Sequence, residues 1–408
     1  MLALRLLAEI REFEAARIQT VVKKTKLKMM LVVGEASGDS HGAKLVEALR
    51  DEAPDSDFEF FGATGERMRE AGVETIVLAD EFAIVGVPEV AKAIPMFLGV
   101  LKKLKKAADE RKPDIAVLID FPEFNLKLAK ALKKKGIKVV YYISPQLWAW
   151  RKYRKRTIKE HVDLLLTILP FEKDWYAKQG IENIEYVGNP LAGEVRSELS
   201  REEFCEKHGL DKEKPIIALL GGSRKREVSK ILPELIKTAS LMSKTNPDLQ
   251  FVNALASTRN LADVEEAGKG IELPKRFVTV QNETYEALNA ADVAAVTSGT
   301  ATLETAIIGT PLAVVYKGSS LNYRLLRPLI SVESFGLVNL IAGRKLAKEL
   351  IQDDFIAEDL SAELFRLLEE DVNKEMRGEL LEIKKSLGDG GASKRAAQAV
   401  LRELETES

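Results

Sequence analysis

A hydroxyl-rich turn in the last third of the chain carries residue types that can hold a nucleotide diphosphate. Ser298, Gly299 and Thr300 follow a short apolar run and open a helical pattern, which Gly309 and Pro311 end. A helix N-terminus after a parallel strand binds anions, because its unpaired N–H groups and its dipole point at the ligand. We expect Ser298 to cap this helix and Gly299 to let a ligand approach the backbone.

A carboxylate lies one helical turn beyond that anion site. Glu304 shares a helix face with Thr300, four residues earlier. A carboxylate repels phosphate, but it can accept hydrogen bonds from both hydroxyls of a neighbouring ribose. The segment therefore fits a nucleotide diphosphate, and an ordinary βαβ turn with a solvated glutamate is the alternative.

A second loop in the same half of the chain indicates phosphate contacts. The sequence GGSRKRE at 221–227 follows the apolar run 216–220. Its glycines let the backbone approach phosphate oxygens, and Arg224 can bind them through two hydrogen bonds. Basic residues also decorate ordinary loops, but the position after a buried strand favours phosphate binding.

Two turns in the first half suit a sugar. GEASGD at 34–39 follows an apolar run and lacks the GxGxxG dinucleotide fingerprint. Glu35 and Ser37 can instead meet a polyol, although a tight turn capped by Ser37 has the same pattern. Asp120 ends the strand 115–119, where ligands meet a parallel sheet, so it is a general-base candidate. A helix cap is the alternative role for Asp120.

The loop SPQLWAWR at 144–151 indicates an edge of that site. It follows the apolar run 139–143 and holds two of the chain's three tryptophans. Trp148 could equally be a side chain packed in the hydrophobic core. Arg151 and the basic run after it instead favour a position at the edge of the binding site.

Two parallel α/β layers are needed to position these turns. From Met29 onward, short apolar runs alternate with helical patterns, which is typical of parallel sheets covered by helices. The segment 186–190 is interpreted as a hinge, and the chain beyond Gly343 is expected to be helical to its end. The expected strands are 31–33, 58–61, 115–119, 139–143, 164–168, 216–220, 251–254, 277–280 and 293–296.

Composition excludes several classes of protein. The 408 residues suit two domains, and 46% hydrophobic with 30% charged residues is typical of a globular protein. A net charge of −2 gives no nucleic-acid signature, and a single cysteine excludes an intrachain disulfide framework. The three histidines are scattered without metal-ligand spacing, and no apolar run reaches membrane-spanning length.

Two segments have an amphipathic character. Residues 1–28 lack the order of a signal peptide and are interpreted as a helical extension. Residues 94–106 join apolar side chains to four lysines, a combination that can meet anionic lipid at a membrane surface. A core-packed helix with a solvated lysine face is the commoner structure for such a pattern.

Together the motifs resemble one family, the lipid-A-disaccharide synthases of glycosyltransferase family 19. The resemblance runs from about Leu31 to Leu401 in the family's order, and the tryptophan loop and the Ser-Gly-Thr turn are its most specific parts. The motifs are GEASGD at 34–39, IDFPEFN at 119–125, SPQLWAWR at 144–151, LPFEK at 169–173, GGSRKRE at 221–227, SGTATLE at 298–304, NLIAGR at 339–344 and GGASKRAAQAVL at 390–401.

The resemblance implies an inverting GT-B glycosyltransferase with two Rossmann-like domains facing a central cleft. The implied donor is UDP-2,3-diacylglucosamine and the acceptor 2,3-diacylglucosamine 1-phosphate, giving a β-1',6-linked lipid A disaccharide 1-phosphate and UDP. It implies no cofactor, no nucleic acid, and a cytoplasmic protein held peripherally at anionic lipid of the inner membrane; a homo-oligomer stays open. Alternatives are another GT-B enzyme on a UDP-sugar, such as a UDP-N-acetylglucosamine 2-epimerase, and a non-catalytic nucleotide-sugar or lipid binder.

The resemblance also implies a division of the chain. The expected parts are the extension at 1–28, an acceptor-binding domain at 29–190, a UDP-sugar-binding domain at 191–365, and C-terminal helices at 366–408 that pack back across the domains.

Matching positions carry the family's roles to this chain. Asp120 is the implied base, and Glu35 is the second candidate. The implied donor-binding residues are Arg224, Ser298, Gly299, Thr300, Glu304, Asn339 and Arg344. The implied acceptor-binding residues are Ser37, Asn125, Trp148 and Arg151.

The chain departs from the family's pattern at Asn189, where histidine is common, at Phe121 and Glu123, where a small residue and aspartate are usual, and at Gly221, where proline is common.

Overall fold

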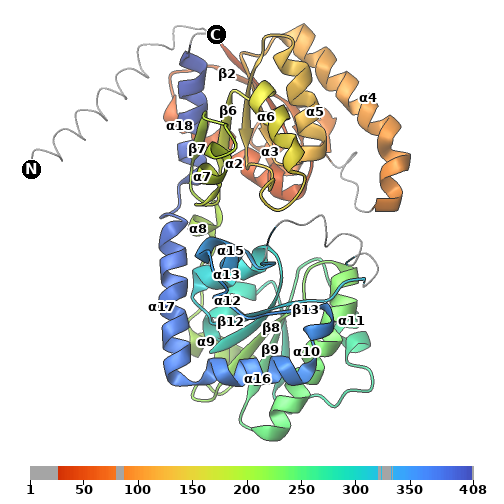
Figure 1. The fold of residues 1–408 in the computed structure, drawn as a ribbon, viewed down its shortest axis with the longest axis vertical. Coiled ribbons are helices and arrows are strands. Elements are labelled where there is room, and N and C mark those ends of the chain that lie inside the picture. Colours follow the sequence, from red (N-terminus) through yellow and green to blue (C-terminus); the bar gives the residue numbers. More distant parts are fainter. Residues whose placement is uncertain (1–25, 80–86, 320–322, 324–331, 333, 407–408) are drawn as a thin grey trace, which may run out of the picture. The chain divides into compact units, whose positions relative to one another are not determined.

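The computed structural model describes residues 26–79, 87–319, 323, 332 and 334–406. The chain divides into two compact units, each with its own parallel sheet (Figure 1). The first unit comprises the chain up to Pro190 and returns at Gly391, and the second comprises Leu191–Gly390.

The first unit is built on a seven-stranded parallel sheet. Its strand order is β3-β2-β1-β4-β5-β6-β7, so the chain builds one half outward from β1 and then resumes at β4 on the other side. The strands are β1 (Leu27–Val32), β2 (Phe58–Thr64), β3 (Glu74–Leu78), β4 (Ile115–Ile119), β5 (Lys138–Tyr142), β6 (Leu164–Thr167) and β7 (Ile184–Tyr186).

Helices cover both faces of this sheet, because its central strands are apolar on both sides. One layer contains α2, α3 and the C-terminal helix α18, and the other contains α4, α5 and α6. The helices are α2 (Ala36–Glu52), α3 (Glu66–Glu70), α4 (Val87–Arg111), α5 (Pro122–Lys133), α6 (Lys155–His161), α7 (Glu172–Ala177) and α18 (Ala392–Glu405).

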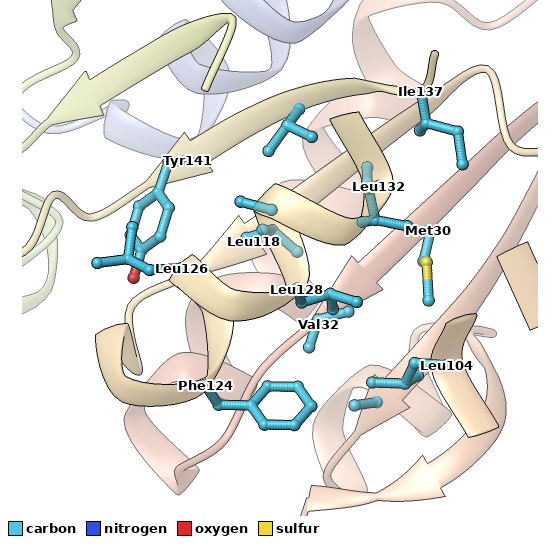
Figure 2. Close-up of a cluster of buried hydrophobic side chains, with 14 of the residues drawn as sticks. Met30, Val32, Leu104, Leu118, Phe124, Leu126, Leu128, Leu132, Ile137 and Tyr141 are labelled. Atoms are coloured by element: carbon cyan, nitrogen blue, oxygen red, sulfur yellow. The ribbon is translucent and has the colours of Figure 1, made fainter. Parts of the chain in front are cut away.

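Figure 2 shows the buried cluster beneath α5. Leu128 and Leu132 of this helix pack with Met30 and Val32 of β1, and all four are fully buried. Tyr141 of β5 belongs to the same cluster and is also 0% exposed. This packing fixes the start of α5 and therefore the turn that joins it to β4.

The second unit repeats the plan with a six-stranded parallel sheet. Its order is β10-β9-β8-β11-β12-β13. The strands are β8 (Ile216–Leu220), β9 (Gln250–Leu255), β10 (Phe277–Gln281), β11 (Val293–Thr297), β12 (Leu312–Tyr316) and β13 (Glu349–Ile351). The helices are α8 (Leu191–Glu194), α9 (Arg201–His208), α10 (Lys225–Thr245), α11 (Leu261–Ala267), α12 (Thr284–Ala290), α13 (Thr300–Ile308), α15 (Leu337–Ala342), α16 (Ala357–Leu368) and α17 (Glu370–Ser386).

The α/β fold with two parallel sheets, predicted from the alternating pattern, is confirmed. The strands predicted at 115–119 and 216–220 have these bounds in the structure. The prediction of a helical chain beyond Gly343 is wrong at β13, since a three-residue edge strand is too short to show strand periodicity. The edge strands β3 and β7 were not predicted either, because they contain too few buried apolar residues to form an apolar run in the sequence.

Helix α18 allows a direct test of this architecture. It comes from the C-terminal end of the chain, but its buried face packs in a hydrophobic core of the first unit. Val400 is 0% exposed, so Val400→Ala should lower the free energy of unfolding by about 1–3 kcal/mol. All three tryptophans (148, 150 and 175) lie in the first unit, so denaturant unfolding followed by tryptophan fluorescence reports on that unit. Lys394→Ala on the same helix removes an exposed ion pair with Glu52 and should change stability by less than about 0.5 kcal/mol. Equal effects of the two changes would contradict the packing described here.

Candidate functional site

Each sheet reverses its strand order at one pair of neighbouring strands. The pair is β1 with β4 in the first unit and β8 with β11 in the second. Ligands of open parallel sheets bind beyond the carboxyl ends of the strands at such a reversal. The four turns predicted to do chemistry follow these four strands, so the topology brings them together in pairs.

A cavity of about 400 Å³ lies at the reversal point of the second sheet. It collects five of the predicted donor-binding residues, which are Arg224, Ser298, Gly299, Thr300 and Glu304. The remaining lining residues are Leu220, Gly222, Ser223, Glu227, Ala254, Ala256, Thr284, Thr297 and Ala301.

The Ser-Gly-Thr turn presents backbone to this cavity. Gly299 is the N-cap residue of α13, with φ +143°, and a Cβ atom at this position would meet no described atom within 4 Å. The prediction that Ser298 caps the helix is wrong, because its hydroxyl donates to the Phe335 carbonyl at 2.8 Å. No side chain in the described chain caps α13, so its first N–H groups face the cavity with the dipole behind them. Gly309 ends the helix as predicted.

Glu304 has a partner that fixes its carboxylate. The Tyr285 hydroxyl donates to Oε1 of Glu304 at 3.2 Å. Burial raises the pKa of Glu304, and the bond from Tyr285 opposes that shift. Tyr285, Thr284 and Glu304 also line an adjoining cavity of about 500 Å³, so the carboxylate stands where two cavities meet.

Arg224 reaches the cavity from the loop after β8. Its side chain is 76% exposed and pairs with Glu227 at 3.4 Å, which leaves most of its donors available to a ligand. Gly222 has φ +98°, and a Cβ atom there would lie 3.0 Å from the Glu227 carboxylate. Glycine is therefore required for the loop to turn this closely.

Asn339 lies outside the cavity lining but supports it indirectly. Its side chain is 1% exposed and donates to the Glu349 carboxylate at 2.8 Å. Glu349 accepts from the backbone N–H groups of Phe335 and Gly336, and the Phe335 carbonyl holds Ser298. These bonds lead from the NLIAGR motif to the Ser-Gly-Thr turn.

Arg344 is also outside the lining of this cavity. It lies at the surface and pairs with Glu379 of α17 at 2.7 Å. The structure thus brings five of the seven predicted donor-binding residues together and leaves Asn339 and Arg344 apart.

In the first unit, Asp120 lies in a strained turn. Asp120 and Phe121 both have φ +48°, a conformation that costs energy for residues other than glycine. The Tyr141 hydroxyl donates to the Asp120 carbonyl at 2.6 Å, and the Asn125 amide donates to it at 2.8 Å. Two buried side chains therefore hold the backbone of the predicted base.

The surroundings of Asp120 favour its protonated form. Burial, and then the charge of Glu35, raise its pKa to about 6, against a hydrogen bond from the Phe121 N–H. Glu35 is exposed at the N-cap of α2, and its charge acts on Asp120, so the two predicted catalytic carboxylates lie within electrostatic reach of each other. A carboxylate with a pKa near neutrality is well matched to proton transfer.

Two predicted acceptor-binding residues differ in exposure. Ser37 is exposed in the first turn of α2. Asn125 is 0% exposed and also donates to the carbonyls of Val32 and Ile119 at 3.4 and 3.2 Å, so it ties the ends of β1 and β4. Its amide therefore shapes the turn from beneath.

Trp148 anchors its loop through a buried carboxylate. It is 6% exposed, and its indole N–H donates to Glu172 at 3.0 Å. Glu172 also accepts from the N–H groups of Ile168 and Leu169. Burial raises the pKa of Glu172 to about 7 despite these hydrogen bonds. Arg151 lies at the surface end of the same loop, with its side chain 36% exposed.

Sequence reasoning missed three of these contacts. Glu227 and Glu172 stand inside the motifs GGSRKRE and LPFEK, and a carboxylate next to an anion loop or a buried turn is a usable signal. Tyr285 carries no such signal, because its approach to Glu304 depends on how α12 packs beside α13.

The described residues contain neither a cluster of metal ligands nor a helix that could span a membrane. Among them, no three histidine, cysteine, aspartate or glutamate side chains gather as metal ligands would. No helix within these parts of the chain is long and apolar enough to cross a membrane.

Known proteins resemble this chain over nearly its whole length. A family model described as lipid-A-disaccharide synthetase matches residues 29–402. The lipid-A-disaccharide synthase of Trichlorobacter lovleyi is 43% identical over 379 residues, covering 93% of this chain and 98% of that protein. The enzyme of the same name from Myxococcus xanthus is 42% identical over 378 residues, covering 92% and 97%.

Solved structures support the fold at much lower identity. The calicheamicin glycosyltransferase CalG4 has a TM-score of 0.58 at 14% identity and covers 94% of this chain and 99% of its own. A UDP-N-acetylglucosamine 2-epimerase from Neisseria meningitidis has a TM-score of 0.58 at 12% identity and covers 92% and 99%. These likenesses show a GT-B fold and no more. The family model and the relatives above 40% identity decide the rest: the chain belongs to the lipid-A-disaccharide synthetase family.

Proposed function

We propose that the chain transfers 2,3-diacylglucosamine from its UDP derivative to 2,3-diacylglucosamine 1-phosphate. Membership in the family makes it a glycosyltransferase that forms the lipid A disaccharide. The finer proposal concerns the two substrates, the residues that hold them, and the site of work at a membrane surface.

One observation carries the donor side of the proposal. The cavity at the reversal of the second sheet combines an uncapped helix N-terminus, an arginine and a partly buried carboxylate. The first two fit a diphosphate and the third fits ribose hydroxyls, so the arrangement suits UDP in the second unit.

Each donor-binding residue then has a role. Ser298, Gly299 and Thr300 hold the diphosphate, and Arg224 neutralises charge on the departing UDP. Glu304 accepts the ribose hydroxyls while Tyr285 keeps its carboxylate in place. Fixed donors at the position where negative charge develops lower the barrier without reorganising during the reaction. Asn339 acts through Glu349 as a positioning residue, and Arg344 orders the same region from the surface.

The acceptor chemistry is assigned to the first unit. Asp120 takes the proton from the acceptor 6-hydroxyl as that oxygen attacks the anomeric carbon of the donor. The new C–O bond forms on the face opposite the breaking bond to UDP, so the configuration inverts. Glu35 raises the proton affinity of Asp120 and is the second candidate for the base.

The remaining acceptor residues divide into contact and support. Ser37 and Arg151 are exposed enough to meet the acceptor, whereas Asn125 and Trp148 shape the turns from within. Asn189, where the family commonly has histidine, is 2% exposed and bonds the Ile168 carbonyl at 3.2 Å, which fits a structural role.

Contact with a membrane surface is proposed for α4. Leu98 is 60% exposed, and Lys102, Lys103 and Lys106 are exposed on the same helix. Met96 and Phe97 instead pack against the core of the first unit. The contact would therefore combine one apolar side chain with a lysine cluster that attracts anionic headgroups at the inner membrane.

The decisive assay follows disaccharide formation by mass spectrometry. UDP-2,3-diacylglucosamine and 2,3-diacylglucosamine 1-phosphate should give a disaccharide 1-phosphate and UDP in equal amounts. Isomerised UDP-sugar without disaccharide would indicate an epimerase instead, and the absence of any turnover would indicate a binder.

Replacing the proposed base tests the chemistry. Asp120→Asn should lower kcat by roughly 10²–10⁴ and leave UDP affinity nearly unchanged. Because the carboxylate is the active form, wild-type kcat/KM should fall as pH drops through about 6. Glu35→Gln is the comparison, and a larger loss of kcat there than in Asp120→Asn would move the base to Glu35.

The same variant has a stability signature. The folded-state pKa of Asp120 is raised from 3.8 to about 6, so the wild type loses stability as pH rises between these values. Asp120→Asn should therefore match the wild type near pH 4 and be more stable above about pH 6. An unchanged stability difference across this range would contradict the burial of an ionised carboxylate.

Donor binding is tested by calorimetry with UDP alone. Arg224→Ala and Glu304→Ala should each weaken UDP binding by about 1–3 kcal/mol, through lost charge-assisted hydrogen bonds. Arg226→Ala is the matched control, since Arg226 is exposed in the same loop but does not line the cavity. Unchanged affinity in the first two variants would place UDP elsewhere.

Membrane contact is tested with vesicles containing anionic lipid. Changing Lys102, Lys103 and Lys106 to glutamine should weaken vesicle binding at low salt, since each lysine near the surface contributes on the order of 1 kcal/mol. The same change at the exposed lysines 237, 244 and 269 of the second unit is the control. Equal losses in both triple variants would show that total charge, and not α4, governs binding.

A further inference from the structure

We propose that Arg151 and Arg154 form a binding subsite for the phosphate monoester of the acceptor, with Glu123 occupying it when no acceptor is bound. This inference rests on the proposed function, because it assigns the 1-phosphate of the proposed acceptor to particular side chains.

Two guanidinium groups converge on one carboxylate. Arg154 Nη2 lies 2.5 Å from Oε2 of Glu123, and Arg151 Nη1 contacts Oε1 of the same residue. Two positive charges therefore meet one negative charge, which leaves a net positive group. The Glu123 side chain is 53% exposed, so solvent and ligands reach this cluster from outside.

The arginines are held in place before any ligand arrives. Arg151 has φ +54°, and its guanidinium lies over the Trp150 ring at 4.1 Å. Arg154 lies over the Tyr153 ring at 5.9 Å, and its side chain is only 11% exposed. Left-handed backbone at a non-glycine residue persists only where the surroundings favour it. A guanidinium stacked on an aromatic ring loses little further freedom when it binds a ligand.

The cluster lies beside the proposed base. Glu123 is in the first turn of α5, three residues after Asp120. Tyr141 links the two regions, because its hydroxyl donates to the Asp120 carbonyl at 2.6 Å. Burial and then the charge of Asp120 raise the pKa of Tyr141, and the charge of Arg154 opposes them, so Arg154 lies within electrostatic reach of the same phenol.

Phosphate fits this arrangement better than the carboxylate that now fills it. A phosphate monoester carries a charge of about −1.5 to −2 and three acceptor oxygens, enough for two guanidinium forks at once. Glu123 is 53% exposed, so its carboxylate returns to water when it is displaced, and the incoming phosphate takes over the hydrogen bonds to both arginines. The carboxylate thus keeps the arginines ordered and yields them to a more highly charged ligand.

A purely structural role is the competing explanation. Arg151 and Arg154 would then tie the tryptophan loop to α5 and have no preference for phosphate. The two explanations differ in one measurable quantity, the ratio of kcat/KM for an acceptor with the 1-phosphate to kcat/KM for the same sugar without it.

The experiment measures this ratio in the full-length enzyme with saturating UDP-sugar. Arg151→Gln and Arg154→Gln should each lower the ratio by about tenfold, mainly through a raised KM for the phosphorylated acceptor. Glu123→Gln should lower that KM, because it removes the competing carboxylate. Arg151→Lys should fall between Arg151→Gln and the wild type, since it keeps the charge but loses the fork.

Arg156→Gln is the matched control. Arg156 lies in the same basic run, is 84% exposed and pairs with Glu160 one turn away, so its loss should leave the ratio unchanged. If Arg154→Gln does not fold, as judged by tryptophan fluorescence, the Arg151 and Glu123 variants still decide the question. Disaccharide formation with an unchanged ratio in those variants would overturn the phosphate subsite. Absence of disaccharide from the wild type would instead overturn the proposed function.

Discussion

The reversal of strand order in each parallel sheet is the constraint on which the rest of this structure depends. Neighbouring strands on either side of a reversal send their connections to opposite faces, so a space opens beyond their carboxyl ends. In the second unit this space is the cavity between the Arg224 loop and the Ser298 turn. In the first unit the corresponding strands, β1 and β4, lead into the turns that contain Glu35 and Asp120.

Three fully or partly buried carboxyl groups lie in the motifs of the candidate site, and each has different neighbours. Burial and the charge of Glu35 raise the pKa of Asp120 to about 6, and burial beneath the tryptophan loop raises the pKa of Glu172 to about 7. Burial also raises the pKa of Glu304, against the hydrogen bond from Tyr285. Carboxylates in such places reduce the stability of the folded state at neutral pH.

Some residues of the family motifs are buried and hold other residues of the motifs in place. Asn125 holds the backbone of Asp120 together with Tyr141, which lies outside the motifs, and Asn339 acts through Glu349 on the turn that contains Ser298. A sequence motif shows which residues occur together, but it does not show whether each one contacts a ligand or supports the backbone. Supporting residues can therefore be mistaken for binding residues. Distances and burial separate the two kinds of role here.

The sequence by itself determined the α/β class, most strand positions and five of the residues that line the cavity of the second unit, because buried strands and glycine-rich turns depend on local patterns. Family membership followed from motifs such as SPQLWAWR, because the order and spacing of motifs can be read directly from the linear sequence. Only the tertiary structure decided that α18 completes the first unit, that Tyr285 meets Glu304, and that Arg151 and Arg154 share Glu123. These contacts join side chains from separate elements, and side-chain position across elements depends on packing that no local pattern encodes.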